Sequence, residues 1–255
     1  MANRNIEQFT SSDLGFCIGP RLNAAGRLDN MSIGVELLLA DDMLKAREFA
    51  LDLDQLNQTR KEIEAGMKLE ALEICQNLTA LFKELPSGIT LYQPDWHQGV
   101  LGIVSSRIKE QYHRPVVAFA KDSEGILKGS ARSIEGLHMR DVLERIHSQH
   151  PNMILKFGGH AMAAGLSLRE EHFDDFQHIF NQTVADWLDE EHLQGVIWTD
   201  GELNSNEFNL ETAELIKSAG PWGQAFPEPC FDGEFKILDQ RAICLLYTSD
   251  AADEL

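Results

Sequence analysis

Glycine, histidine and very small residues follow one another in the segment Lys156-Phe157-Gly158-Gly159-His160-Ala161-Met162-Ala163-Ala164-Gly165. This composition is poor material for a hydrophobic core, but it lets the main chain approach a ligand closely. Paired glycines permit positive φ, and successive backbone N–H groups in such a conformation bind anions. We therefore expect Gly158, Gly159 and His160 to contact a phosphate in an open loop. A tight turn between two packed elements would use the same residue types.

Two further segments combine cations with small residues. One is Lys128-Gly129-Ser130-Ala131-Arg132-Ser133, and the other is Gly19-Pro20-Arg21-Leu22-Asn23-Ala24-Ala25-Gly26-Arg27-Leu28. In an extended chain residues i and i+2 point to the same side, so Ser130 and Arg132 can grip one phosphate with a hydroxyl and a guanidinium fork. We interpret the second segment as a loop that brings Arg21 and Arg27 to a strand-binding channel. Salt bridges are the alternative role for these arginines.

His97 is the last candidate, because it precedes Gln98-Gly99, where we expect a helix to begin. The N–H groups and the dipole of a helix start favour an anion. A purely structural histidine fits the same position. Nearby aromatic residues can stack on unpaired bases, although core packing is the commoner fate of such residues; they are Tyr92, Trp96 and Phe157.

Together with Trp96-His97-Gln98-Gly99-Val100-Leu101-Gly102-Ile103-Val104, the order and spacing of these segments resemble the RecJ family, from about Asn3 to about Arg241. RecJ proteins are single-strand-specific DNA exonucleases with 5′ to 3′ polarity that serve DNA repair and recombination. The resemblance implies a DHH-type phosphoesterase with a metal-binding amino-terminal domain, a DHH-associated substrate domain and an OB-fold. It also implies that Ser130 and Arg132 hold the 5′ end of single-stranded DNA, and that a single-strand-binding protein or a helicase is a partner.

The chain departs from this family because it contains no Asp-His-His triplet, and the aspartate-rich motifs expected before Asn3 are missing. We therefore expect no catalytic residue and no metal ligand in this chain, and no cleavage by it alone. The manganese or magnesium pair that the family implies would lie on the missing domain and activate water for in-line attack.

The net charge of −19 argues against a polyanionic ligand, but the charge is distributed unevenly. Residues 1–96 carry 9 Lys and Arg against 15 Asp and Glu, and residues 170–255 carry 3 against 20. Residues 97–169 carry 10 against 6, and they also hold Ser130, Arg132 and the glycine-rich segment. We expect a local cationic face on an otherwise acidic protein.

The chain contains no apolar run of the roughly 20 residues that span a bilayer, and its first residues form no signal-peptide core. The four cysteines include no CxxC pair, so neither a zinc site nor a disulfide framework is predicted. We expect a soluble cytoplasmic protein.

Hydrophobic periodicity predicts an α/β fold in which a sheet is flanked by helices. One or two long helices should occupy residues 41–85 and end at the breaker Pro86-Ser87-Gly88. Strands and helices should then alternate. We expect strands at 89–92, 116–119, 127–131 and 163–168, and helices at 100–111, 139–148 and 171–188.

Four parts follow from this pattern and the resemblance. Residues 1–85 form the end of the catalytic region and a long connecting helix, and residues 86–192 form the DHH-associated domain. Residues 193–241 begin an OB-fold, with a strand at 196–198, a helix at 210–219 and a proline-rich loop; too few residues remain for its five strands. Residues 242–255 look like a non-native tail.

Two other functions fit the same motifs. The Gly-Gly-His…Ala-Ala-Gly pattern also resembles sibling phosphoesterases that act on oligoribonucleotides or cyclic dinucleotides. Alternatively, the chain is a non-catalytic interaction module whose acidic last third recruits a partner protein.

Overall fold

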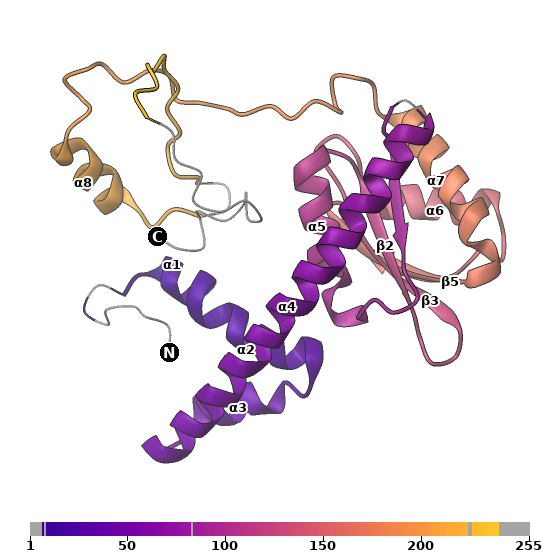
Figure 1. Ribbon diagram of the computed structural model, residues 1–255, viewed down its shortest axis with the longest axis horizontal. Coiled ribbons are helices and arrows are strands. Elements are labelled where there is room, and N and C mark those ends of the chain that lie inside the picture. The colour runs from indigo at the N-terminus through magenta and orange to yellow at the C-terminus, as the bar shows by residue number, and fades with distance from the viewer. Residues whose placement is uncertain (1–6, 8, 83, 224–225, 240–255) are drawn as a thin grey trace. The chain divides into compact units, whose positions relative to one another are not determined.

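The computed structural model describes residues 7, 9–82, 84–223 and 226–239 (Figure 1). It divides into two compact units, of which the larger comprises residues 21–195. The smaller unit comprises residues 2–20 and 196–255. All of the candidate phosphate contacts predicted from the sequence lie in the larger unit.

Three helices open the described chain of the larger unit: α2 (Gly19–Leu28), α3 (Ser32–Leu39) and α4 (Met43–Phe82). The loop predicted between Arg21 and Arg27 is wrong, because these residues form α2. Pro20 is the second residue of this helix, which continues directly from the π-helical turn Leu14–Ile18. Ala24 and Ala25 are fully buried and allow close packing.

Helix α4 has 40 residues and is about 60 Å long, so the long helix predicted to end near residue 85 is present. Its second half turns Met67, Ala71 and Cys75 toward the sheet, at intervals of four residues that place them on one face of the helix. Burial raises the pKa of the Cys75 thiol to about 12, so this cysteine is a packing residue.

The larger unit contains a five-stranded sheet with the strand order β1-β2-β3-β5-β4. β1 and β2 are parallel, and the other three neighbouring pairs are antiparallel. The strands are β1 (Ile89–Tyr92), β2 (Val116–Lys121), β3 (Ile126–Arg132), β4 (Ile154–Gly159) and β5 (Ala163–Arg169). Four of them were predicted, and β4 was not.

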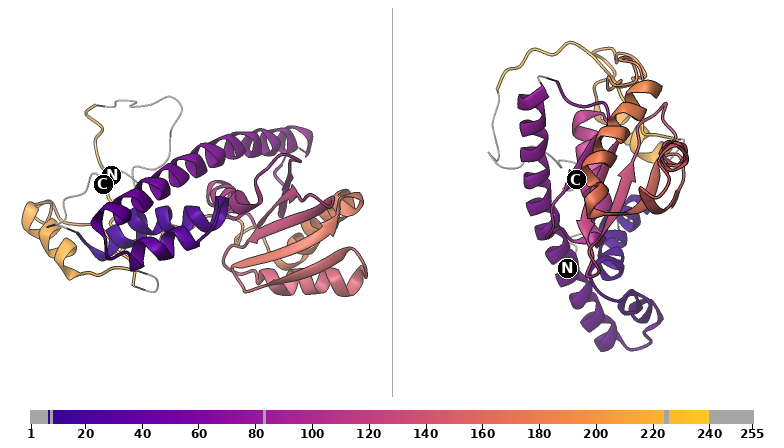
Figure 2. Two further views of the ribbon diagram at one scale, coloured as in Figure 1. Left: turned by 90° about the horizontal axis from the view of Figure 1, so that it is seen from below. Right: turned by 90° about the vertical axis from the view of Figure 1, so that its right-hand side faces the viewer.

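Helices cover both faces of this sheet, as the two views of Figure 2 show. On one face lie α6 (Met139–Gln149) and α7 (Phe173–Trp187), packed on a core that includes Phe119, Phe176 and Phe180. On the other face lie α4 and the crossover helix α5 (Leu101–Tyr112), which packs against β2 and β3. The predicted sheet flanked by helices is confirmed.

Helix α5 covers only part of its face of the sheet, over β2 and β3. Beyond β3, on the same face of β5 and β4, the residues Lys156, Gly158 and Gly165 are exposed. The larger unit therefore leaves this part of β4 and β5 exposed.

The smaller unit contains α1 (Ser11–Asp13), a π-helical turn (Leu14–Ile18) and α8 (Leu210–Ala219). The sequence predicted α8 but not the two elements before it. Its described residues form two isolated bridges, Glu202 with Asp232 and Gly223 with Phe226. The strand predicted at residues 196–198 is wrong, because β-type composition needs a pairing partner and none is present among the described residues. The predicted tail 242–255 lies outside the described residues.

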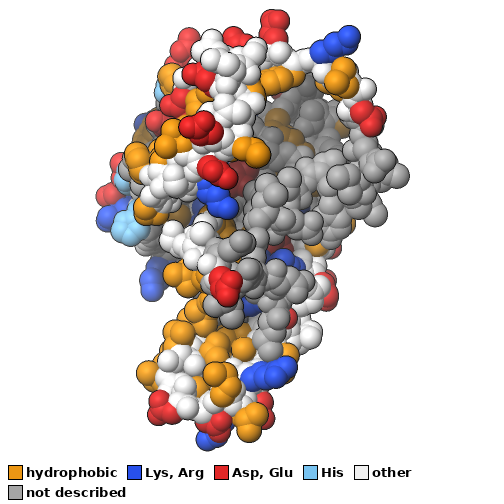
Figure 3. All heavy atoms as spheres, turned by 90° about the vertical axis from the view of Figure 1, so that its left-hand side faces the viewer, with side chains coloured by type: hydrophobic (Ala, Val, Ile, Leu, Met, Phe, Trp, Pro, Cys, Tyr) orange, Lys and Arg blue, Asp and Glu red, His pale blue; other side chains and the backbone are white. Residues whose placement is uncertain are grey.

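Apolar side chains are exposed over α3 and the start of α4, which form the lower part of Figure 3. Leu38, Leu39, Met43 and Leu44 are each more than 70% exposed. No helix within the described ranges is long and apolar enough to cross a membrane.

Candidate nucleic-acid interface

Strand β3 separates its side chains cleanly between the two faces of the sheet. Leu127 and Ala131 enter the core, and a Cβ at Gly129 would stand 2.5 Å from the Phe119 ring, so packing requires this glycine. Ser130 and Arg132 point to the opposite face, and Nη1 of Arg132 donates to Oγ of Ser130 at 3.3 Å. The predicted common orientation of Ser130 and Arg132 is confirmed.

The guanidinium of Arg132 is held by neighbouring groups. Nε donates to Oγ of Ser106 on α5 at 3.2 Å, and Nη1 also donates to the Ala131 carbonyl at 2.9 Å. Nη2 faces Gly102, where a Cβ would stand 2.6 Å away. Sequence reasoning missed Ser106 and Gly102, although their spacing of four residues places them on one face of α5.

Arg132 is half-buried and forms no ion pair with any described residue. Burial, and then the positive charge of Arg27, lower the pKa of Arg132. Arginine remains protonated near neutral pH despite such a shift. The site therefore holds a cation without a counter-ion.

Arg27 reaches the same region from α2. Its Nη1 donates to the Gly99 carbonyl at 3.0 Å, and a Cβ at Gly99 would overlap the Arg27 carbonyl oxygen. The 3-10 turn Gln98–Val100 and α5 begin here, so backbone N–H groups and the helix dipole add further positive potential. Arg27, Arg132 and the start of α5 together can bind an anion.

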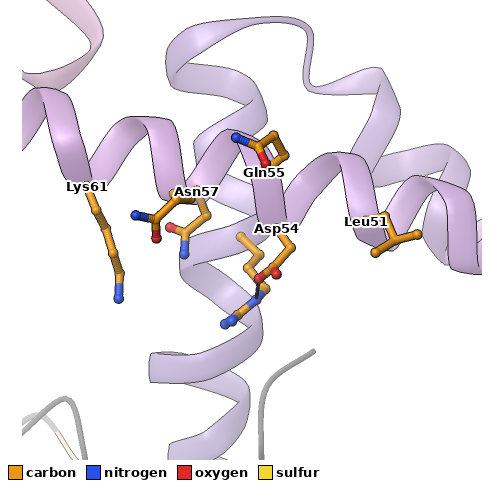
Figure 4. A pocket seen from close by; sticks show the side chains of 7 residues that line it. Leu51, Asp54, Gln55, Asn57 and Lys61 are labelled. Carbon is orange, nitrogen blue, oxygen red and sulfur yellow. Dashed lines mark hydrogen bonds and ion pairs between the residues drawn. The ribbon is translucent and has the colours of Figure 1, made fainter.

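His97 and Arg21 have structural partners. Nδ1 of His97 accepts a hydrogen bond from the Gly99 N–H at 3.1 Å and caps the 3-10 turn, while the residue is exposed. Nε of Arg21 pairs with Oδ1 of Asp54 on α4 at 2.7 Å. Arg21 thus lines a separate pocket between α2 and α4 (Figure 4).

Gly158 and Gly159 belong to β4, so the open loop predicted for them is wrong. The antiparallel pairing of β4 with β5 stabilises the segment as strand. Gly159 has φ of 148°, and a Cβ there would overlap Ala163 and Ala164, so the fold itself requires this glycine.

Gly158 and Gly165 are opposite each other on β4 and β5, and, unlike Gly159, they are not required by the packing of the fold. A Cβ at Gly158 would meet no atom within 4 Å, and one at Gly165 would meet only the Gly129 carbonyl oxygen, at 3.8 Å. Glycine weakens a strand, and internal packing does not require it at either position. These glycines leave room for a molecule that approaches the sheet from outside.

His160 begins the tight turn between β4 and β5, and it is exposed. Its N–H donates to the Ala163 carbonyl at 2.8 Å, so this group is used within the turn and does not belong to an open nest. The Ala161 and Met162 carbonyls accept from the N–H groups of Met139 and Ser133. The turn is thereby fixed beside the end of β3.

Neighbouring strands align these residues in rows across the sheet. Ser130 is opposite Gly165, which is opposite Gly158, and the adjacent row contains Lys128, Ser167 and Lys156. The two lysines were not predicted, although the period of two along β3 places Lys128 with Ser130. We call this surface the open sheet face; its residues are Lys128, Ser130, Arg132, Lys156, Gly158, Gly165 and Ser167.

The three aromatic candidates take part in packing. Trp96 is 5% exposed, and its Nε1 donates to Oε2 of Glu70 on α4 at 2.7 Å. The Tyr92 hydroxyl donates to Oε1 of Glu170 at 2.6 Å, and Phe157 packs against the core. The described residues also contain no cluster of three or more His, Cys, Asp or Glu that could hold a metal.

Two family models match the chain. The DHHA1 domain matches residues 80–186, which include the sheet, and the RecJ OB domain matches residues 199–244.

The proteins of similar sequence described next share the name RecJ. The single-stranded-DNA-specific exonuclease RecJ of Haemophilus influenzae is 93% identical over 243 residues, which cover 95% of this chain and 42% of that protein. The Escherichia coli protein of the same name is 58% identical with the same coverage. The chain thus spans less than half of the length of these relatives.

The crystal structure of Thermus thermophilus RecJ with Mn²⁺ superposes with a TM-score of 0.75 at 28% identity, over 88% of this chain and 32% of that one. The domain matches, the sequence identity and the fold all agree with the resemblance to RecJ that the motifs indicated. The chain therefore belongs to the RecJ family and carries its DHHA1 domain together with RecJ OB sequence.

Proposed function

We propose that this chain is the nucleic-acid-binding part of a single-stranded-DNA-specific exonuclease with 5′ to 3′ polarity, and that it holds the strand by its 5′ phosphate. The observation that supports this proposal most directly is the half-buried Arg132, which has no counter-ion among the described residues and lies beside Arg27 and the start of α5. A burial of this kind is costly unless an anion completes the site.

The 5′ phosphate is the preferred group because of its charge. A terminal phosphate monoester carries close to two negative charges near neutral pH, whereas a phosphodiester carries one. The hydroxyl of Ser130 and the guanidinium groups of Arg27 and Arg132 supply donors, and charge-assisted hydrogen bonds of this kind are the stronger ones. A site with two cations and a helix start therefore selects the end of a strand over its interior.

The open sheet face accepts the nucleotide attached to that phosphate. Gly158 and Gly165 expose backbone next to Ser130, so a sugar or base can lie close against the strands. His160, on the adjoining turn, is a further phosphate donor. Lys156 adds positive charge to this face, whereas Lys128 is already paired with Asp122 at 3.4 Å.

Cleavage is assigned to polypeptide beyond this chain. The solved Thermus thermophilus RecJ structures contain Mg²⁺ or Mn²⁺, and a divalent metal on that part of the protein would supply an activated water for phosphodiester hydrolysis. The open sheet face contributes positioning and charge neutralisation, and we expect the chain alone to bind without cleaving. Delivery of the strand by a single-strand-binding protein or a helicase, in the cytoplasm, is part of the proposal on family resemblance alone.

Fluorescence anisotropy of the full chain with single-stranded DNA tests this function. Oligomers with a 5′ phosphate and with a 5′ hydroxyl are compared at two salt concentrations. We expect a preference of about tenfold for the phosphate, because a hydrogen bond to a charged group contributes about 1.5 to 3 kcal/mol. Arg132→Ala should remove this preference.

Arg140→Ala is the matched control, because Arg140 is exposed on α6 and forms no ion pair with a described residue. A preference that persists in Arg132→Ala would exclude the proposed site. Tighter binding of a cyclic dinucleotide than of the oligomers would instead favour a sibling phosphoesterase.

A further inference from the structure

Residues 189–195 form the last segment of the larger unit, and we call them the exit strap. The DHHA1 match ends at residue 186 and the RecJ OB match begins at residue 199, so the exit strap lies between the two domain sequences. All of its residues are exposed except Leu193, which packs against the core that α6 and α7 cover. The exit strap therefore depends on few contacts with the rest of the unit.

Arg114 makes a polar contact with the exit strap from the end of α5. Its Nη1 donates to the Leu193 carbonyl at 2.5 Å, and also to the carbonyls of Tyr112 and His113 at 3.4 and 3.0 Å. The last carbonyls of a helix have no partner within the helix, so the same group caps α5. One guanidinium thus ties the exit strap to the end of this helix.

The exit strap has a second contact at Gly136, in the loop between β3 and α6. Gly136 has φ of 88°, and a Cβ there would stand 2.5 Å from the His192 ring. The ring is oriented by Asp189, because Nδ1 of His192 lies 2.6 Å from Oδ1 of Asp189. The exit strap therefore bridges the end of α5 and the loop that follows β3.

The closed position of the exit strap leaves Arg114 poorly compensated. The side chain is partly buried and forms no ion pair with any residue that the structure describes. Its Nε is buried without a hydrogen-bond partner among the same residues. A buried donor without an acceptor destabilises the state in which it is buried. Segments with few buried contacts are also the ones that open locally while the rest of a protein stays folded.

We propose that the exit strap opens as a unit, by release of Leu193 from Arg114, while the sheet stays folded. With the exit strap closed, residues 196–198 are the free connection to the OB sequence and span at most about 10 Å. With it open, the connection has about ten residues and spans up to about 35 Å. The fold thus provides a connection of two lengths, and this inference does not depend on the proposed DNA site.

Hydrogen exchange of the full chain measures the opening. The N–H groups of Leu193 and Gln194 donate to the carbonyls of Glu190 and Glu191 within the exit strap, so they report on its local structure. Arg114→Ala should speed their exchange about ten- to hundredfold, because a hydrogen bond from a charged group is lost. The N–H groups of β2 and β3 should exchange as before.

A second variant is needed because Arg114 also caps α5. Leu193→Ala removes the apolar anchor of the exit strap and leaves Arg114 in place, so it should speed the same exchange. Arg140→Ala is the control, since Arg140 is an exposed arginine of α6 away from the exit strap.

The distance between two spin labels tests the longer connection. One label is attached to Cys230, which is exposed in the smaller unit, and the other to Ser148→Cys on α6, in a chain that also carries Cys244→Ser. The distribution of distances should broaden in Arg114→Ala and in Leu193→Ala, and it should be unchanged in Arg140→Ala.

Three outcomes would overturn the proposal. Exchange that rises equally in the exit strap and in β3 would show that the two unfold together. Exchange that is unchanged in both variants would show that Arg114 and Leu193 do not hold the exit strap. Faster exchange of the exit strap with an unchanged distribution of distances would exclude the longer connection.

Discussion

Gly102 lies directly against the guanidinium of Arg132. A Cβ on Gly102 would stand 2.6 Å from Nη2 of Arg132 and 3.1 Å from Oγ of Ser130. Both atoms belong to the two residues that we assign to the 5′ phosphate. The absence of a side chain at Gly102 thus sets the position of the binding groups.

Gly102→Ala should therefore impair binding with little effect on stability. The added methyl group would displace the end of the Arg132 side chain and no backbone atom, so the cost to the fold should be small. We expect about a tenfold loss of the 5′ phosphate preference, measured by anisotropy, and an unchanged midpoint of thermal unfolding. A large fall in the midpoint together with normal binding would show that Gly102 serves packing instead.

Gly99→Ala should, in contrast, mainly reduce the stability of the fold. A Cβ there would overlap the Arg27 backbone, which cannot move aside without shifting α2. Overpacking of this kind costs about 1 to 3 kcal/mol, so the unfolding midpoint in urea should fall. Gly66→Ala is the matched control, since Gly66 lies inside α4 with no atom within 4 Å of the added Cβ, and helix propensity predicts a gain of about 0.5 to 1 kcal/mol. Equal effects of the two substitutions would contradict the close contact.

The neighbouring glycines of β4 should separate fold from function. Gly158→Ala fills open space, so the fold should be as stable as before or more stable by about 0.5 kcal/mol, while DNA binding weakens. Gly159→Ala should lose about 1 to 3 kcal/mol, because its backbone conformation is unfavourable for other residues. Calorimetry and anisotropy on both variants check this pair. Undiminished binding by Gly158→Ala would remove the open sheet face from the proposed site.

Tyr92 should titrate at unusually high pH. Burial, and then the hydrogen bond to the Glu170 carboxylate, raise the pKa of Tyr92 to about 12. Because the unfolded phenol has a pKa of about 10, the stability that this group contributes is present below pH 10 and is lost as the pH rises toward 12. Glu170→Gln should lower the pKa of Tyr92 only in part, since burial remains. Tyrosinate absorbance, with Tyr92→Phe to identify the signal, measures it; an unchanged titration in Glu170→Gln would exclude the carboxylate as a cause.

Glu170 also holds the Lys121 ammonium, at 2.6 Å, and this contact lowers the pKa of its carboxyl. Its contribution to stability is therefore present above the ordinary carboxyl pKa and is lost in more acidic solution.

Local periodicity was enough to predict most elements of the larger unit. Strand β3 alternates between Leu127 and Ala131 on one side and Ser130 and Arg132 on the other, and this period of two is visible in the sequence. Helix α6 carries Met139, Val142, Leu143 and Ile146 at helical spacing, all of them buried. In both cases the pattern along a single segment determines the element.

The elements that were missed depend on distant partners. Strand β4 ends in Gly158 and Gly159, which weaken any local strand signal, and its structure comes from pairing with β5. Helix α2 contains Gly19, Pro20 and Gly26, which usually mark a loop. The contact between Arg27 and Gly99 has no local signal at all, because it joins residues far apart along the chain. For the same reason, Ser106 and the lysines of the open sheet face were not recognised as neighbours of the predicted residues.

The three hydrogen bonds that hold Arg132 have a consequence for the speed of binding. A long side chain loses about 1.5 to 2 kcal/mol of rotamer entropy when it is fixed, and at Arg132 this loss occurs during folding. An arriving strand then meets a group that is already in place and needs no rearrangement there. Association should consequently be governed by diffusion and by the local electric field, and differences in affinity among variants of this site should appear mainly as differences in how long the strand stays bound.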